Sequence, residues 1–194
     1  MLGDDELMGS LASHSEQALA ILACDRMAPH HGNILIGGLG MGFTLGAALS
    51  VLPQTSKIVV AELIPQVVKW AAGPLAHLFG TTLSDPRLFL DMRDVHDVIE
   101  EAEEIFDGII FDVDNGPDGF VCAANERLYS AWGLRAAYAA LRPTGVLAIW
   151  SAYPDDEFVE RLVRAGFAVE EITVPDTEIG QRAVHTIWLA EKPR

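Results

Sequence analysis

Residues 33–62 read NILIGGLGMGFTLGAALSVLPQTSKIVVAE, and this stretch decides the fold class. An apolar run leads into the glycine cluster Gly37–Gly42, a second apolar run follows, and a β-branched segment ends at Glu62. Glycines permit a tight turn, and a strand before such a turn with a helix after it is the context of nucleotide-binding units. The pattern predicts a strand over Asn33–Gly37, a helix over Phe43–Leu52 and a strand over Lys57–Glu62.

The uncharged run Ile34–Leu52 is also long enough to be considered as a transmembrane helix. A glycine cluster of this density fits a turn better than a helix interior, because glycine loses the most backbone freedom there. The first ten residues, MLGDDELMGS, are acidic and lack the basic start of a signal peptide. We therefore expect a cytoplasmic protein with no membrane partner.

The rest of the chain alternates predicted helices and strands, which favours a mainly parallel sheet covered on both faces. Helices are expected over Ser15–Met27, from Pro65 to a break at Gly73-Pro74, and over Asp94–Glu104, Glu126–Leu141 and Asp155–Ala165. Strands are expected over Arg87–Leu90, Asp107–Asp112, Val146–Ser151 (after a turn at Pro143–Gly145), Phe167–Val174 and Val184–Ala190. The last two strands are joined by a loop alone, so they should be antiparallel. We predict one α/β domain over residues 1–194, with a short N-terminal extension over residues 1–14.

Composition limits the partners that this domain can have. The formal net charge is −15, which argues against nucleic acid, because phosphate binding needs clustered Lys and Arg. The acidic surface either favours a cationic small-molecule acceptor or simply keeps the protein soluble. Cys24 and Cys122 lack metal-ligand spacing and are expected to be inert, reduced thiols. The histidines are interpreted as having no metal-ligand partner at helical spacing, so no metal site is predicted.

Two features point to a nucleoside ligand beyond the carboxyl ends of the strands, where ligands bind in open α/β sheets. The glycine turn, with Gly38, Gly40 and Gly42, lets the backbone approach a ligand and leads into a helix N-terminus. Glu62 ends the next strand about 20 residues later, where a carboxylate accepts hydrogen bonds from ribose hydroxyls. The alternatives are a tight turn without a ligand and a solvated strand end.

Two further acidic positions follow the third and fourth predicted strands. Asp94 could accept from an adenine amino group while the Val95 N–H donates to the ring, or Asp94 could cap the helix that it begins. In the turn DVDNGP, Asp112 and Asp114 could hold or deprotonate an attacking amine, and Asn115 could supply a carbonyl acceptor. The alternative is a turn that uses Asp and Asn only for its backbone geometry.

The segments IGGLGMGFTL, VVAELIPQVV, FDGIIFDVDNGP and LRPTGVLAIWS together resemble the spermidine synthase-like group of class I S-adenosylmethionine-dependent transferases, which includes the polyamine aminopropyltransferases. The resemblance extends from about Ser15 to the C-terminus. It implies a Rossmann-like class I methyltransferase fold, with a seven-stranded, mostly parallel sheet in the order 3-2-1-4-5-7-6 and a reversed seventh strand.

The resemblance also implies roles for individual residues. The glycine turn would contact the amino-acid or aminopropyl tail of the ligand, Glu62 the ribose and Asp94 the adenine. The implied cofactor site consists of Gly38, Gly40, Gly42, Glu62, Leu63, Asp94, Val95 and Asp112. The implied catalytic residues, which handle the amine, are Asp112, Asp114 and Asn115.

The sequence departs from that group at three places. About a dozen residues precede the first predicted helix, where the group has an N-terminal β domain. Ser15-Glu16 stands at the group's tyrosine-glutamine pair, and DVDNGP replaces a DSSDP-type turn, so that the group's catalytic aspartate aligns with Asn115.

These features predict a transferase that binds S-adenosylmethionine or decarboxylated S-adenosylmethionine. It would move a methyl or aminopropyl group to a small acceptor, expected to be an amine, and leave S-adenosylhomocysteine or methylthioadenosine. The alternatives are a non-catalytic adenosyl-nucleoside-binding protein and an NAD-dependent oxidoreductase. A homodimer is left open.

Overall fold

The computed structural model describes residues 13–27, 32–113, 116–117, 126–176 and 183–194. Its centre is a seven-stranded sheet with the order β3-β2-β1-β4-β5-β7-β6. The strands are β1 (Asn33–Gly37), β2 (Lys57–Ala61), β3 (Leu88–Asp91), β4 (Phe106–Phe111), β5 (Leu141–Ser151), β6 (Ala168–Asp176) and β7 (Ala183–Glu191). Strands β1 to β5 pair in parallel, whereas β7 is antiparallel to both β5 and β6. The predicted order and the reversed seventh strand are confirmed.

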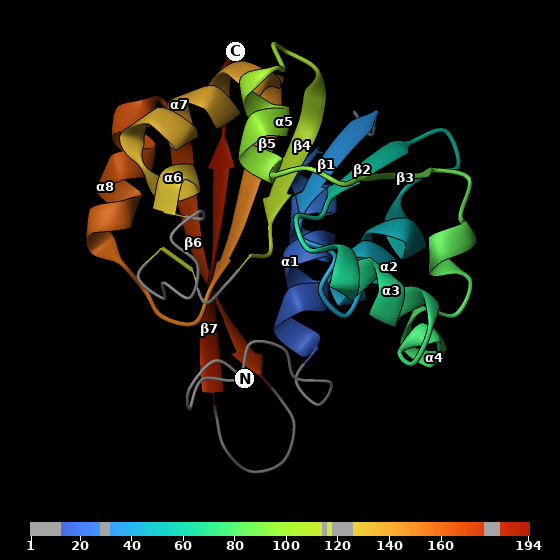
Figure 1. Ribbon diagram of the computed structural model, residues 1–194. Helices are drawn as coiled ribbons and strands as arrows, with labels where there is room; N and C mark the ends of the chain where they lie inside the picture. Colours follow the sequence, from blue (N-terminus) through green and yellow to red (C-terminus); the bar gives the residue numbers. More distant parts are fainter. Residues whose placement is uncertain (1–12, 28–31, 114–115, 118–125, 177–182) are drawn as a thin grey trace.

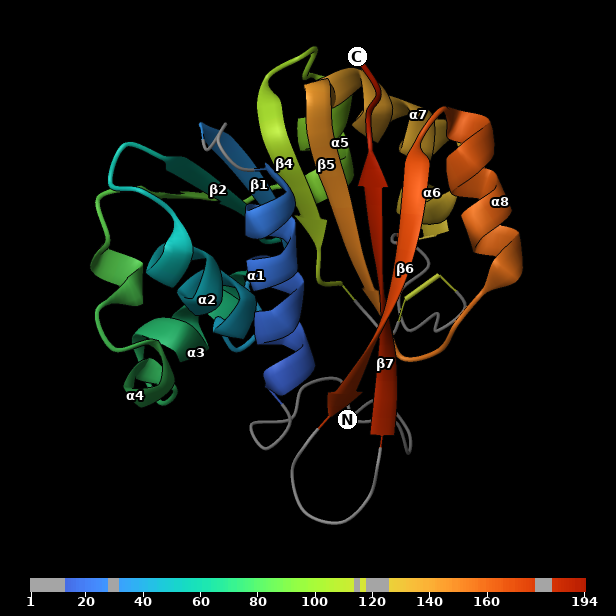
Figure 2. The same ribbon diagram turned by 180° about the vertical axis from the view of Figure 1, so that it is seen from behind.

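Helices cover both faces of the sheet (Figures 1 and 2). One layer contains α1 (His14–Met27), α2 (Phe43–Val51), α3 (Pro65–Ala72) and α4 (Ala76–Phe79), and a short 3-10 helix spans Thr82–Ser84. The other layer contains α5 (Val95–Glu100), α6 (Glu126–Tyr129), α7 (Ala131–Ala140) and α8 (Asp156–Ala165). Because neighbouring strand residues point to opposite faces, Ile34 and Ile36 join the first layer's core and Leu35 the second.

The strand–turn–helix interpretation of Ile34–Leu52 is confirmed, since this run forms β1, the glycine turn and α2. Among the described residues, no helix combines the length and the apolar character needed to cross a membrane. Cys24 is buried in α1, and burial raises the pKa of its thiol to about 12, in agreement with an inert cysteine. Cys122 lies outside the described residues.

The helix predicted over Asp94–Glu104 is too long, because α5 ends at Glu100. The backbone N–H groups of Glu104 and Ile105 donate to the carbonyl oxygens of Ala139 and Ala140 at the end of α7, both at 2.9 Å. Glu104 also adopts a positive φ of 50°. Contacts with a distant helix therefore end α5 one turn early.

The single helix predicted over Glu126–Leu141 is also wrong. It divides into α6 and α7 at Ser130, whose hydroxyl caps α7 by accepting from the Gly133 N–H at 3.1 Å. Strand β5 then begins at Leu141 rather than Val146, and the predicted turn at Pro143–Gly145 is an irregularity inside that strand. The Thr144 N–H donates to the Lys192 carbonyl after β7, and this pairing holds the irregular segment in the sheet.

Candidate functional site

The residues that follow β1 to β4 meet at one edge of the sheet. These strands are parallel neighbours, and their last residues are in register, with Gly37 beside both Ala61 and Phe111, and Ala61 beside Asp91. The glycine turn, Glu62, Asp94 and Asp112 each follow one of these ends. The structure thus brings the four features that the sequence singled out to a common edge.

The glycine turn is tightly enclosed at two of its positions and open at the third. Gly38, Gly40 and Gly42 have φ values of 87°, 49° and 80°, a region that side chains with a Cβ rarely adopt. A Cβ at Gly38 would lie 2.9 Å from the Asp112 carbonyl oxygen, and one at Gly42 would lie 2.3 Å from the ring of Phe79. At Gly40 no described atom would lie within 4 Å of an added Cβ, so the backbone is open to approach there.

Glu62 connects this turn to the turn that follows β2. Its Oε2 accepts from the Leu39 N–H at 3.0 Å, and its Oε1 accepts from the Ile64 N–H at 2.7 Å. The side chain is 6% exposed. An ionised carboxylate has about four acceptor positions, so two hydrogen bonds leave capacity for a ligand's hydroxyl groups.

Two apolar residues lie beside Glu62 at this edge. Leu63 is 51% exposed and Ile64 is 54% exposed, although both are large and hydrophobic. Exposed apolar side chains next to converging polar groups are typical of small-molecule sites, where the apolar surface packs on a flat ring. Leu63 was in the predicted cofactor site, whereas Ile64 was not.

Asp94 serves as the N-cap of α5. Its Oδ1 accepts from the His96 N–H at 2.9 Å, and its Oδ2 accepts from Nη2 of Arg127 on α6 at 2.9 Å. The capping interpretation is therefore correct. Each of the two oxygens keeps one further acceptor position, and acceptance from an adenine amino group stays a prediction. The Val95 side chain packs on Gly37, which holds the start of α5 against the end of β1.

Asp112 follows β4, and its carboxylate accepts a hydrogen bond from a residue of α2. Thr44 in the first turn of α2 is buried and donates from its hydroxyl to Asp112 Oδ2. Burial raises the pKa of the Asp112 carboxyl, and the hydrogen bond from Thr44 partly opposes that rise. Thr44 is not among the residues predicted from the sequence, because a threonine inside an apolar helix carries no distinctive signal.

Asp114 and Asn115, the other predicted catalytic residues, lie outside the described residues. The turn is described again at Gly116, which has a φ of 96° and lies so close to Ser151 at the end of β5 that a Cβ would clash with its hydroxyl. Two cavities, of about 490 and 370 Å³, are lined by described residues elsewhere, and neither contains the glycine turn, Glu62 or Asp112.

A second polar cluster connects α1 with the end of β5 and with β7. The buried Ser15 hydroxyl lies 3.0 Å from Nε1 of Trp150 and 2.8 Å from Nδ1 of His185. His185 belongs to the part of the β6–β7 hairpin that extends beyond β5, whose last residue, Ser151, pairs with Thr186. In the sequence, Ser15 stands out only as part of Ser15-Glu16, which departs from the tyrosine-glutamine pair of the resembling group. Its contact with His185 joins two positions at opposite ends of the chain, so local sequence does not reveal it.

Comparisons with known proteins support the fold. A spermidine synthase from Thermotoga maritima matches 93% of this chain and 60% of its own, at 21% identity and a TM-score of 0.75. A spermidine synthase in complex with the transition state analogue AdoDATO matches 93% of this chain and 59% of its own, at 20% identity and a TM-score of 0.74.

A methyltransferase is also similar: the 1,6-didemethyltoxoflavin-N1-methyltransferase of Burkholderia thailandensis, with bound S-adenosylhomocysteine. It covers 94% of this chain and 80% of its own, at 20% identity and a TM-score of 0.65. No protein-family model matches the sequence, and a search of curated proteins finds no relative. This chain spans about 60% of the length of the two spermidine synthases. The comparisons, the strand order and the reversed β7 together identify a Rossmann-like fold of the class I methyltransferase type.

Proposed function

We propose that this chain binds S-adenosylmethionine or decarboxylated S-adenosylmethionine at the carboxyl edge of β1, β2 and β4, and transfers an alkyl group to a small amine. The observation that carries the proposal is Glu62, which is buried, accepts from the backbone of two turns and still has acceptor capacity beside the open Gly40. The described residues fit an adenosyl group, because they combine a carboxylate, an open glycine backbone and exposed apolar side chains.

The proposed roles follow from where each residue lies. Glu62 would accept from the ribose hydroxyls, Leu63 would pack on the base, and Gly38 to Gly42 would lie along the tail of the ligand. The sulfonium supplies an alkyl carbon that is already activated, so the protein mainly has to align the acceptor and exclude water. A carbon–nitrogen bond then forms as the carbon–sulfur bond breaks.

The acceptor amine has to lose a proton, and two carboxylates are our candidates for managing it. Asp114 is proposed to take the proton from the attacking nitrogen, because it lies next to the position that aligns with the catalytic aspartate of the resembling group. Asp112, which Thr44 holds in place, is proposed to orient the acceptor. Asn115 would supply a carbonyl acceptor.

The first test is the identity of the ligand. Calorimetry with S-adenosylhomocysteine, methylthioadenosine and NAD should show binding of an adenosyl thioether. Glu62→Ala should weaken that binding about 10–100-fold, since a lost hydrogen bond to a charged acceptor costs about 1.5–3 kcal/mol. Tight NAD binding without adenosyl thioether binding would reject the proposal in favour of an oxidoreductase.

A non-catalytic adenosyl-binding protein is the second candidate, and the departure of DVDNGP from the catalytic turn of the resembling group favours it. A screen with S-adenosylmethionine and its decarboxylated form against putrescine, other amines and hydroxyl acceptors separates the two. If an acceptor is found, Asp114→Asn should lower turnover about 10²–10⁴-fold without changing adenosyl affinity. Intact adenosyl binding without any acceptor would support the non-catalytic protein.

A further inference from the structure

His96 is a buried polar side chain whose ring makes no hydrogen bond to the part of the chain that the structure describes. It lies in the first turn of α5 and is 1% exposed. Among the described residues, neither Nδ1 nor Nε2 has a hydrogen-bond partner. Burying polar atoms without partners costs about 1–3 kcal/mol, and native structures keep few such groups without a functional reason. The environment of this ring therefore calls for an explanation.

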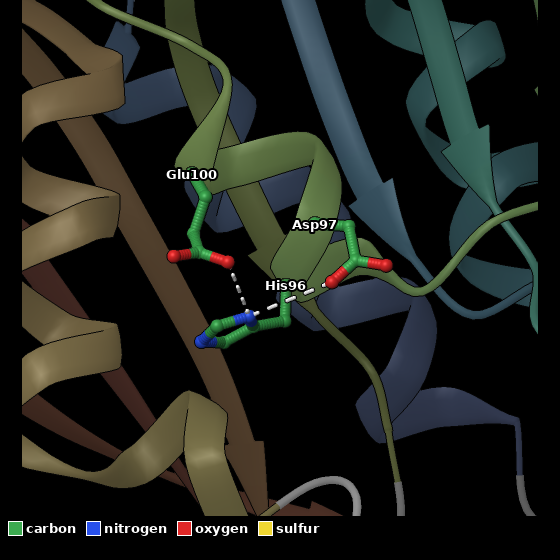
Figure 3. Close-up of side chains that lie close together, drawn as sticks. All are labelled: His96, Asp97 and Glu100. Atoms are coloured by element: carbon green, nitrogen blue, oxygen red, sulfur yellow. Dashed lines mark ion pairs between the residues drawn. The ribbon is translucent and has the colours of Figure 1, made fainter.

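Two carboxylates of the same helix converge on one edge of the His96 ring (Figure 3). Nδ1 lies 3.4 Å from Oε2 of Glu100 and 3.9 Å from Oδ1 of Asp97. The side chains of Glu100 and Asp97 are 38% and 52% exposed, so an ion from the solvent can reach their carboxylates. The three ligand atoms all lie within 4.8 Å of one another.

Packing against Trp132 fixes the position of the ring. The ring of Trp132 on α7 packs on His96 with centroids 4.7 Å apart and planes 34° apart. The backbone N–H of His96 donates to the Asp94 side chain, and this bond anchors the start of the helix that carries the ring. The imidazole is thus held in one orientation before any ligand arrives, and this lowers the entropic cost of binding.

We propose that His96 Nδ1, Asp97 and Glu100 bind a divalent transition-metal ion of the Zn²⁺ type. Ligand atoms about 2.0–2.2 Å from such an ion stand about 3–4 Å apart, which is the separation of Nδ1 from the two carboxylate oxygens. An imidazole with two carboxylates is a donor set that suits Zn²⁺, Ni²⁺ or Cu²⁺, whereas Mg²⁺ and Ca²⁺ take oxygen ligands. Water would complete the coordination on the exposed side.

No metal site was predicted from the sequence, because the histidines were interpreted as having no ligand partner at helical spacing. That prediction overlooked Glu100, which lies four residues after His96 and on the same helix face. The site does not depend on the adenosyl-binding proposal, since none of its three ligands is assigned to that function. The competing explanation is a direct pairing of His96 with Glu100 without a metal.

The test is calorimetric titration of Zn²⁺ into the untagged, chelator-treated full chain near pH 7.5, compared with Glu100→Gln and Asp97→Asn. Each variant should lower the affinity by at least about tenfold, because even the loss of an outer-shell partner costs about 10–100-fold. The matched control is Glu103→Gln, which changes a nearby exposed carboxylate outside the cluster and should leave the affinity unchanged.

These variants also separate the site from other zinc-binding groups of the chain. His30 and His31 are adjacent in the sequence and can bind Zn²⁺ themselves, so uptake by the unaltered chain is not sufficient evidence. In the imidazole NMR spectrum, Zn²⁺ should shift the His96 resonances of the unaltered chain and not those of Glu100→Gln. Equal Zn²⁺ affinity in the unaltered chain and Glu100→Gln, absence of uptake, or tighter binding of Mg²⁺ would each overturn the proposal.

Discussion

At the scale of single residues, Asp94 divides its two oxygens between two partners. Oδ1 caps α5 through the His96 N–H, and Oδ2 pairs with Arg127, whose side chain is 53% exposed. The capping role depends on the shape of the side chain, because Asn caps a helix about as well as Asp. The pairing depends on the second oxygen, and we assign the predicted contact with an adenine amino group to the same oxygen, because Oδ1 is turned towards the helix N-terminus.

This division predicts different outcomes for two substitutions. Asp94→Asn should keep the cap, so the capping contribution to the free energy of unfolding should change by less than about 0.5 kcal/mol. The loss of the partly exposed ion pair with Arg127 should add only a small further cost. Asp94→Asn should nevertheless weaken adenosyl binding, because an amide NH₂ replaces an acceptor. Asp94→Ala should also destabilise the protein by about 1 kcal/mol. Urea denaturation and calorimetry on both variants check this, and unchanged affinity in both would remove Asp94 from the binding site.

Asp112 is a residue whose ionisation is linked to folding. Burial raises the pKa of its carboxyl above the ordinary value of an aspartate side chain. At pH values between the pKa of Asp112 in the unfolded chain and its higher pKa in the folded protein, the folded protein holds an additional proton. The contribution of Asp112 to the stability of the fold is therefore fully present below the pKa of the unfolded state. It is lost as the pH rises through the pKa of the folded state.

We predict that Asp112→Asn abolishes this pH dependence. The stability of the variant relative to the unaltered protein should rise as the pH increases from about 4 towards neutrality, because only the unaltered protein has to ionise a buried carboxyl. Thr44→Val removes a hydrogen bond to the carboxylate and should move the transition to higher pH. Urea denaturation at a series of pH values measures both effects, and a constant difference across the series would contradict them.

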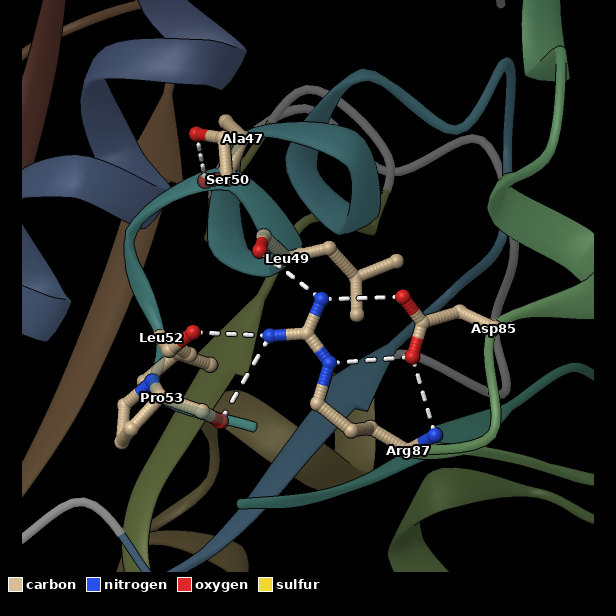
Figure 4. Close-up of polar contacts among 7 residues, drawn as sticks. All are labelled: Ala47, Leu49, Ser50, Leu52, Pro53, Asp85 and Arg87. Atoms are coloured by element: carbon tan, nitrogen blue, oxygen red, sulfur yellow. Dashed lines mark hydrogen bonds and ion pairs between the residues drawn. The ribbon is translucent and has the colours of Figure 1, made fainter. Parts of the chain in front are cut away.

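At the scale of secondary-structure elements, the end of α2 is joined to the start of β3 by Arg87 (Figure 4). The guanidinium donates to the carbonyl oxygens of Leu52 at 2.7 Å and Leu49 at 3.0 Å, and it also pairs with Asp85. Its side chain is only 6% exposed. The last carbonyl groups of a helix have no partner within the helix, and a cation placed there also complements the helix dipole. This contact supports the helix that carries the glycine turn at its other end.

Arg87→Met should therefore destabilise the protein by about 3 kcal/mol, because the charge-assisted hydrogen bonds to the carbonyl groups of Leu49 and Leu52 are lost together with a longer one to Pro53. The matched control is Arg93→Met. Arg93 pairs with Asp91 and Glu101, but its side chain is 44% exposed, so its loss should cost less than about 1 kcal/mol. Chemical denaturation of the two variants gives the comparison, and similar losses for both would show that the contacts of Arg87 with α2 contribute little.

At the scale of the whole molecule, the formal net charge of −15 acts on any charged partner. A field of one sign attracts ligands of the opposite charge, and salt screens it, since the Debye length falls from about 30 Å at 0.01 M to about 10 Å at 0.1 M. A cationic acceptor such as an amine would experience this field. A neutral adenosyl thioether would not.

We predict that the affinity for putrescine falls several-fold when NaCl is raised from about 0.01 to 0.3 M, while the affinity for methylthioadenosine changes by less than about twofold. Calorimetry at a series of salt concentrations measures both. If the two ligands respond equally to salt, the acidic surface serves solubility alone and the preference for a cationic acceptor is wrong.

The sequence by itself determined the elements whose geometry depends on adjacent residues. The strand at Asn33–Gly37, the glycine turn and the helix from Phe43 are as predicted, because glycine at positive φ and an uninterrupted apolar run act locally. The helix that begins at Pro65 also stops before Gly73-Pro74 as expected. The edge at which Glu62, Asp94 and Asp112 meet follows from strand order, and the resemblance implied that order correctly.

Only the tertiary structure decided the features whose partners come from distant parts of the chain. Helix α5 ends early because α7 takes up the following N–H groups, and β5 begins early because Lys192 pairs with Thr144. The contacts of Asp94 with Arg127 and of Asp112 with Thr44 are of the same kind. His96 loses its access to water as Trp132 packs on it. Packing between distant elements sets these hydrogen bonds and this burial, and no local sequence pattern encodes them.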